Sequence, residues 1–162
     1  MRLSWRGAHI YAVLIALAVS ANASTSRFNV SPAAEPAVLA RNLQSKNPTE
    51  AAASAYWLGL KGPAAVAVIP HLIAALSDDR PANPAVYRSG AKNGAHSTPG
   101  EEAANALARI GQPAIDPLIT ALRASTSAVA RRNAAAALGQ INSTSHGSTT
   151  AASPRPGPDQ QD

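Results

Sequence analysis

The sequence predicts an all-α protein in which pairs of short helices stack into an α-α superhelix of about two and a half repeats. An alanine-rich stretch, AANALARIG at 103–111, recurs as NAAAALGQI at 133–141. Only 4% of the residues are aromatic. Helices that pack through small side chains suit this composition better than β-sheets, whose faces need branched and aromatic residues.

Each alanine-rich helix is expected to pair with a second, more apolar helix. The first pair covers 51–62 and 63–76, and the second covers 101–112 and 113–122. A last helix of the first type, at 127–141, has no second helix after it. One such pair leaves apolar faces uncovered, so the pairs must stack on one another.

Two of the first helices begin at the same kind of start signal. NPTE at 47–50 and TPGE at 98–101 each supply a capping residue, then a proline, and a glutamate at the third helical position. In a capping box the glutamate reaches back to the N–H of the capping residue, and its charge suits the positive end of the helix. Ser31-Pro32 predicts a further helix start.

Corresponding leucines set the spacing of the repeats. Leu138 lies 31 residues after Leu107, whereas Leu107 lies 49 residues after Leu58. The extra length comes from 78–97, which contains two prolines and two glycines and has no helical periodicity. This segment is therefore predicted to be a loop inserted at a repeat junction.

The second helices carry apolar residues at helical spacing, which predicts one buried stripe in each helix. Pro70 and Pro117 are tolerated if they lie in or near a first turn. The predicted stripes are Val66, Ile69, Ile73 and Leu76 in the first pair and Ile115, Leu118, Ile119 and Leu122 in the second.

The N-terminal residues 1–23 have the pattern of a signal peptide. Arg2 and Arg6 precede an apolar run at 10–19, and the segment ends in Ala-Asn-Ala at 21–23. The apolar run is shorter than the ~20 residues that cross a bilayer. We therefore expect cleavage after Ala23, export to the periplasm or the medium, and no stable membrane span afterwards. The alternative is an uncleaved amphipathic or anchoring helix.

The repeat domain is expected to cover 32–142. Residues 24–31 are predicted to be a flexible lead-in. Residues 143–162 are rich in Ser and Thr and then in Pro, with almost nothing to bury. They are predicted to form a disordered tail.

A family resemblance rests on two stretches. These are AANALARIGQPAIDPLITAL at 103–122, and Arg131 followed by AAAALGQI at 134–141. They are similar to HEAT-like repeats of the phycobilisome-lyase type, and the resemblance extends over about 36–142. It implies a stack of helix pairs, but these repeats occur in scaffolds, adaptors and a few enzymes, so it implies no single activity.

No residue pattern indicates catalysis, a metal site or a cofactor. The chain has no cysteine, and none of the common nucleophile, phosphate-binding or zinc motifs occurs. Glu101-Glu102 is interpreted as a helix start, where the helix dipole favours acids. Without Arg2 and Arg6, twelve basic and nine acidic residues leave a net charge of +3. This is too small to indicate nucleic-acid binding by itself.

The candidate partner-binding residues are mostly in the inserted loop. Arg80, Tyr87, Arg88 and Lys92 would offer cationic and aromatic contacts above a rigid scaffold. His71 is a further candidate on a second helix, facing the concave side. The plain alternatives are a solvated insertion and an ordinary surface histidine. The uncovered face of the last helix could also accept a partner or another copy of the chain.

These features together predict a non-catalytic protein–protein interaction module or scaffold in the periplasm or outside the cell. Its partner would be a protein bound through the loop and the concave face, and not a nucleic acid. One alternative is a small enzyme or lyase accessory subunit of the same fold. Another is a truncated remnant without independent activity, because the second helix of the last pair is missing.

Overall fold

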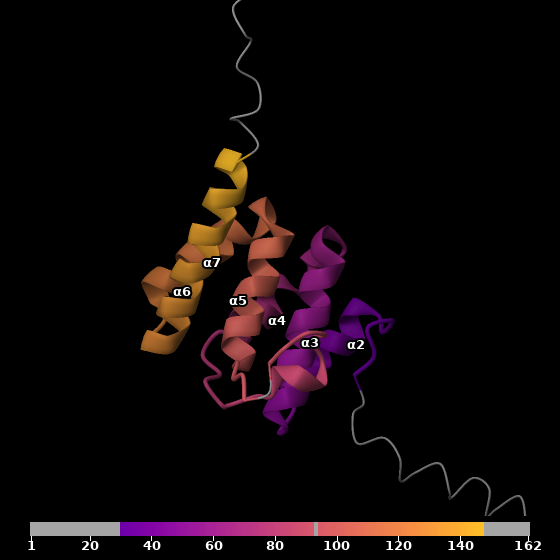
Figure 1. Cartoon of the computed structure of the whole chain (residues 1–162). Coiled ribbons are helices and arrows are strands. Elements are labelled where there is room, and N and C mark those ends of the chain that lie inside the picture. The colour runs from indigo at the N-terminus through magenta and orange to yellow at the C-terminus, as the bar shows by residue number, and fades with distance from the viewer. Residues whose placement is uncertain (1–29, 93, 148–162) are drawn as a thin grey trace, which may run out of the picture.

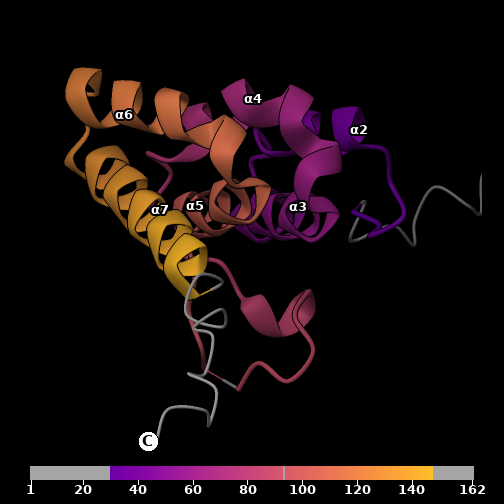
Figure 2. The ribbon, with the colours of Figure 1, turned by 90° about the horizontal axis from the view of Figure 1, so that it is seen from above.

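The computed structural model describes residues 30–92 and 94–147, and it confirms an all-α superhelix (Figure 1). The predicted signal peptide, nearly all of the lead-in, and residues 148–162 lie outside the described residues. Within the described part the helices form two layers, which Figure 2 shows as two rows. One layer contains α2 (Pro36–Asn42), α4 (Ile69–Ala75) and α6 (Ile115–Ala124), and the other contains α3 (Pro48–Lys61), α5 (Pro99–Ile110) and α7 (Ala128–Gly147).

The first helix of each pair is α3, α5 or α7, and the second helices are α4 and α6. Stacking is most extensive within the layer of first helices, where α5 packs between α3 and α7. Across the layers, α3 packs on α2, α5 on α4, and α7 on α6. Each first helix therefore packs against the second helix of the preceding pair. Because α2 supplies such a helix at the N-terminal end, each of the three first helices has a partner in the other layer.

The capping residues and prolines predicted for α3 and α5 are confirmed, but no direct hydrogen bond joins either glutamate to the N–H of its capping residue in the described structure. Asn47 Oδ1 accepts a hydrogen bond from the Thr49 N–H at 2.9 Å, and Thr98 Oγ accepts one from the Glu101 N–H at 3.1 Å. At α3 the glutamate acts through a relay. Glu50 accepts from the Ser45 hydroxyl at 2.7 Å, and that hydroxyl accepts from the Asn47 N–H at 3.1 Å.

The helix start predicted at Ser31-Pro32 is wrong. Residues 31–34 form a turn, closed by a hydrogen bond of 3.0 Å from the Ala34 N–H to the Ser31 carbonyl. The helix begins four residues later at Pro36, after Glu35 in an extended conformation. Both candidate starts have a proline at the first helical position, so the proline alone could not distinguish them.

Glycines at the ends of α3 and α5 fix the register of the repeat. Gly62 has φ 53° and Gly111 has φ 82°, a region that favours glycine, and each ends its helix. The corresponding residue in the third helix is Asn142. Without a glycine stop, α7 continues to Gly147. The predicted boundary between helix and tail at Asn142 is therefore wrong for 143–147.

The second helices are partly 3₁₀. The 3₁₀ helix η2 (Gly62–Val68) precedes α4, and η4 (Gln112–Ala114) precedes α6. Pro70 and Pro117 lie in the first turns of α4 and α6, as predicted. Of the stripe predicted from Val66, Ile69 and Leu76 are buried and Ile73 is partly buried. The prediction is wrong for Val66, because a 3₁₀ helix has about 3.0 residues per turn and shifts the phase. Val66 is 38% exposed, whereas Leu72, outside that stripe, is fully buried.

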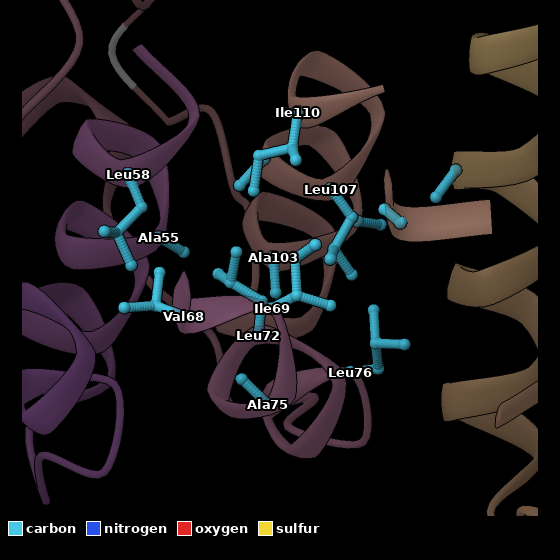
Figure 3. Packing of buried hydrophobic residues seen from close by; sticks show 14 of the residues in the cluster. Ala55, Leu58, Val68, Ile69, Leu72, Ala75, Leu76, Ala103, Leu107 and Ile110 are labelled. Carbon is cyan, nitrogen blue, oxygen red and sulfur yellow. The ribbon is translucent and has the colours of Figure 1, made fainter. Parts of the chain in front are cut away.

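The core lies between the two layers and consists mainly of leucine and alanine. Figure 3 shows Leu58, Leu72 and Leu107 among the side chains packed there. Leu118 of α6 is also fully buried, but Ile115, Ile119 and Leu122 are only partly buried. Only one residue of the stripe predicted for α6 is therefore fully buried. No further helix pair lies beyond α6 and α7 in the described chain to cover the rest.

The run Pro48–Ala75 is long and apolar enough to cross a membrane by length and composition. In the fold it is interrupted by the positive φ of Gly62. Its two parts, α3 and η2–α4, contribute Leu58 and Leu72 to the core. This arrangement is that of a repeat helix pair.

The contact between α3 and α5 leads to the first prediction. A Cβ at Gly59 would lie 2.9 Å from the Ala106 Cα, whereas a Cβ at the corresponding Gly139 would meet nothing within 4 Å. We expect Gly59→Ala to destabilise the protein by about 1–2 kcal/mol, because the clash outweighs the better helix propensity.

Gly139→Ala is the matched control, and we expect it to stabilise the protein by about 0.5–1 kcal/mol. Urea unfolding followed by circular dichroism measures both changes. Equal effects of the two substitutions would contradict a close α3–α5 contact.

Candidate functional site

The inserted loop between α4 and α5 is tied together at its base. Ala82 and Ser97 form an antiparallel bridge, with N–H to carbonyl distances of 2.8 and 3.3 Å. Within the loop, Asn83 caps the short 3₁₀ helix η3 (Pro84–Val86). The insertion is where the sequence predicted it, but it contains one helical turn.

Glu102 of α5 holds the loop against the scaffold. Its side chain is 1% exposed. Its Oε1 accepts hydrogen bonds from the Tyr87 hydroxyl at 3.0 Å and the Ser97 hydroxyl at 2.8 Å. Both of its oxygens lie 2.7 Å from Nη2 of Arg88. The interpretation of Glu101-Glu102 as a plain helix start is therefore incomplete, since Glu102 is the buried anchor of the loop.

Tyr87 does not present its ring to a partner. It is 5% exposed and packs with Ala52 and Ala53 of α3, while its ring centroid lies 5.6 Å from that of Tyr56. Burial, followed by the negative charge of Glu102, raises the pKa of the Tyr87 hydroxyl above its usual value. The predicted role of Tyr87 as an exposed aromatic contact is replaced by a role in loop packing.

The two loop arginines also make contacts within the chain. Arg88 pairs with Glu102, and its guanidinium lies 5.1 Å from the centre of the Tyr56 ring. Its side chain is nevertheless 39% exposed, and its buried Nε has no hydrogen-bond partner. Arg88 therefore belongs both to the anchor and to the surface.

Arg80 connects the loop to the turn between α2 and α3. It pairs with Asp78 at 2.6 Å and donates to the carbonyls of Lys46 at 2.9 Å and Ser45 at 3.0 Å. Hydrogen bonding from Arg80 lowers the pKa of the Asp78 carboxyl below its usual value. Arg80 thus acts as a clamp at the start of the loop.

The remaining candidates are exposed and do not share one site. Lys92 lies in the loop, and its carbonyl accepts from the Ala95 N–H at 3.0 Å. His71 lies on α4, in the layer opposite the first helices (Figure 2). The structure therefore brings Tyr87 and Arg88 together, but it does not bring His71 to them.

A polar cleft of about 580 Å³ lies between the loop and helices α5 and α7. The sequence did not predict it, because its walls come from three separate segments. Asn105 of α5 and Gln140 of α7 meet there, with a hydrogen bond of 3.1 Å between their amides. The polar side chains of the lining are Arg88, Ser89, His96, Ser97, Glu101, Glu102, Asn105, Asn133 and Gln140.

A second depression lies between the second helices. It has a volume of about 670 Å³ and is lined largely by apolar residues of α4 and α6, including Ile69, Ile73 and Ala121. Asp116 and Thr120 are among its few polar residues. Within residues 30–92 and 94–147, no group of three His, Cys, Asp or Glu side chains could hold a metal ion.

Comparison with known families matches residues 101–124 to the family described as PBS lyase HEAT-like repeat. The chain carries a HEAT-like repeat. The matched segment spans most of α5 and all of η4 and α6, and the preceding α3–η2–α4 has the same order of elements. No curated protein and no solved structure matches the chain.

The HEAT-like register shows what distinguishes the helix that holds the loop. Glu102 of α5 corresponds to Ala53 of α3 and to Asn133 of α7. Asn133 is also buried, and its amide donates to the Leu76 carbonyl at 2.9 Å. A charged residue at this inward position, in the helix that follows the insertion, was the sequence signal for the anchor.

The anchor leads to the second prediction. Glu102→Gln removes the charge that pairs with Arg88 and weakens the acceptor of three side chains. We expect a loss of about 1–3 kcal/mol in stability, moderated by the exposure of Arg88. Hydrogen exchange at the Ala82 and Ser97 amides should also become faster, because the loop base opens.

Glu101→Gln is the matched control. Glu101 is about half exposed and lies 3.9 Å from Arg132. Its loss should therefore change stability by less than about 0.5 kcal/mol and leave loop exchange unchanged. If Glu102→Gln behaved like Glu101→Gln, Glu102 would not be the anchor.

The Asp78–Arg80 pair leads to a pH-dependent prediction. Hydrogen bonds from Arg80 hold the pKa of Asp78 in the folded chain below the ordinary value of an aspartate, which is about 4. The ionised carboxylate therefore stabilises the fold above that pH, and the stabilisation disappears as the pH falls through the folded pKa. We expect Asp78→Asn to cost up to ~1 kcal/mol near pH 7 and progressively less below about pH 4.

Urea unfolding at several pH values measures this difference. Asp79→Asn is the control, because Asp79 is exposed and adjacent to Asp78, whereas Arg80 pairs with Asp78. A cost of Asp78→Asn that stays constant down to about pH 2 would contradict the charge pair as its source.

Proposed function

We propose that the protein is a non-catalytic binding module for another protein, and that the partner binds in the cleft between the inserted loop and α5–α7. The main support for this proposal is the anchored loop. Glu102, at the floor, holds one wall of the cleft against the helices through Tyr87, Arg88 and Ser97. A wall that is already ordered loses little conformational freedom on binding, and this favours affinity.

The lining of the cleft fits a polar segment of a protein. Asn105 and Gln140 offer amide donors and acceptors, and Arg88 and Glu101 bring charges of both signs. Such groups can hydrogen-bond to a peptide backbone and to side chains of either charge. HEAT-like repeats also form modules that often bind proteins, which agrees with this use of the scaffold.

We further propose that the protein works after export, in the periplasm or outside the cell. The support comes from the N-terminal sequence, with Arg2 and Arg6 before the apolar run and Ala-Asn-Ala at 21–23. The absence of cysteine means that an oxidising compartment would form no disulfides in the chain.

Affinity capture tests the binding proposal. The bait is the full chain with a C-terminal tag, expressed in its source cells and recovered from the exported fraction. In a parallel bait, Gln140→Trp fills the cleft from its exposed α7 side. We expect the first bait to retain a protein partner and the second to lose it by at least about tenfold, because even a modest steric conflict costs more than 1.4 kcal/mol.

Gln44→Trp is the matched control, since Gln44 is exposed and does not line the cleft. It should capture the partner as well as the unmodified bait does. Equal capture by Gln140→Trp would move the site away from the cleft. N-terminal sequencing of the recovered bait tests export separately, with Ser24 as the expected first residue and Met1 as the contrary result.

A further inference from the structure

The first helices of the stack meet through one repeated set of positions. At the α3–α5 contact, α3 contributes Tyr56 and Gly59, and α5 contributes Ala106 and Arg109. A Cβ at Gly59 would lie 2.9 Å from the Ala106 Cα and 3.4 Å from the Arg109 Cδ. The Arg109 guanidinium lies 5.8 Å from the centre of the Tyr56 ring.

The next contact, between α5 and α7, uses the corresponding positions. Asn105 corresponds to Tyr56, and Gln140 corresponds to Arg109. These two side chains also meet, with a hydrogen bond of 3.1 Å. Ala137, which corresponds to Ala106, is fully buried. The stack therefore repeats one geometry with different side chains.

We call the side of a first helix that meets the next first helix its forward face, and the opposite side its backward face. No described helix covers the forward face of α7. Ala135 is exposed, although the corresponding Ala55 and Ala104 are buried. Gly139 corresponds to Gly59, and nothing lies within 4 Å of a Cβ built there. α7 thus offers a face of the shape that α3 offers to α5, and no described helix occupies it.

On α3 the backward face, the side that would face a preceding first helix, is covered only in part by the described residues. Trp57 corresponds to Ala106 and is only partly buried. Leu60 corresponds to Arg109 and is 52% exposed, a high value for a leucine. The first helix of the stack therefore carries large apolar side chains at the positions that would face a preceding first helix.

We propose that the protein assembles head to tail, with the forward face of α7 in one copy docking on the backward face of α3 in the next copy. The partner is a second copy because the two open faces are the two halves of a contact that the chain already makes twice. Small residues around Gly139 would receive Trp57 and Leu60, as Gly59 receives Ala106.

Within residues 30–92 and 94–147, no helix covers either end of the second layer. Ile119 and Leu122 are partly buried and lie on the opposite side of α6 from Thr120 and Ala124, which line the groove towards α4. At the other end, Val38 of α2 is 36% exposed. Because the contact joins two different faces, each added copy leaves the same two ends open, and the assembly grows as a chain.

Sedimentation velocity of the full-length protein, from ~5 µM to ~500 µM, tests the assembly, since one helix–helix contact implies weak association. The weight-average mass should rise with concentration and pass that of two chains. Gly139→Glu and Leu60→Glu should each remain monomeric over the whole range. Mixed at equal concentrations they should form a dimer and nothing larger, because each variant keeps the face that the other has lost.

Circular dichroism melting confirms that each variant is folded. Position 139 has open space, and Leu60 is half exposed, so neither change should disturb the core. Ala135→Glu is a second variant of the α7 face and should behave like Gly139→Glu. Neither Gly139 nor Leu60 lines the polar cleft, so partner capture there should be unchanged in both.

Three results would overturn the proposal. A monomeric full-length protein at all concentrations would show that the two faces do not meet. Self-association of Leu60→Glu alone would indicate a symmetric α7–α7 contact instead. Failure of the mixed variants to dimerise, although the unmodified protein associates, would place the contact elsewhere on the surface.

Discussion

The close approach of the first helices is the contact on which the rest of the fold depends. Gly59 lets α3 and α5 come so near that a single added methyl group would meet the neighbouring backbone. The residues that face this side on the following helices are small as well: Ala106 of α5 and the corresponding Ala137 of α7 are buried. In the other layer, the second helices begin as the 3₁₀ helices η2 and η4. The two layers can then enclose a core built from leucine and alanine with few aromatic residues.

Burying one carboxylate converts a long insertion into part of the scaffold. Glu102 would be costly inside the protein without partners, since a buried charge must be compensated by hydrogen bonds and an opposite charge. The loop supplies both through Tyr87, Ser97 and Arg88. The polar cleft exists because this compensation holds the loop at a fixed distance from α5 and α7. Two of the four loop residues expected to contact a partner, Tyr87 and Arg88, are therefore used to build the cleft.

Local signals allowed much of the fold to be predicted from the sequence. The caps of α3 and α5, the tolerated Pro70 and Pro117, and the position of the insertion depend on neighbouring residues and were predicted correctly. The errors arose where a distant partner or a change in helix type decides the outcome. Val66 lies in a 3₁₀ segment that no single residue of the sequence predicts. Glu102 was already explained by its place at a helix start, so its buried role was hidden.

The end of α7 was missed for a related reason. The Ser/Thr-rich composition after Asn142 suggested chain without structure, yet Ser143 turns its hydroxyl to the Gln140 carbonyl at 2.9 Å and remains in the helix. The helix continues because position 142 is not a glycine. At the corresponding positions, Gly62 and Gly111 end α3 and α5. A composition rule describes a segment, whereas a helix stop depends on one residue.

The loop and its anchor are also neighbours in the sequence, with only a few residues between Ser97 and Glu102. The segment 78–102 therefore encodes a wall of the cleft together with most of the polar contacts that hold it. Outside the segment, the loop needs two small residues and one aromatic ring on the preceding first helix, at Ala52, Ala53 and Tyr56. Arg80 also donates to the carbonyls of Ser45 and Lys46, and the Asn83 N–H donates to Thr49 Oγ1. A helical-repeat protein would therefore have to offer the preceding turn and helix start, as well as those three residues, before it could receive the segment and hold it as this chain does.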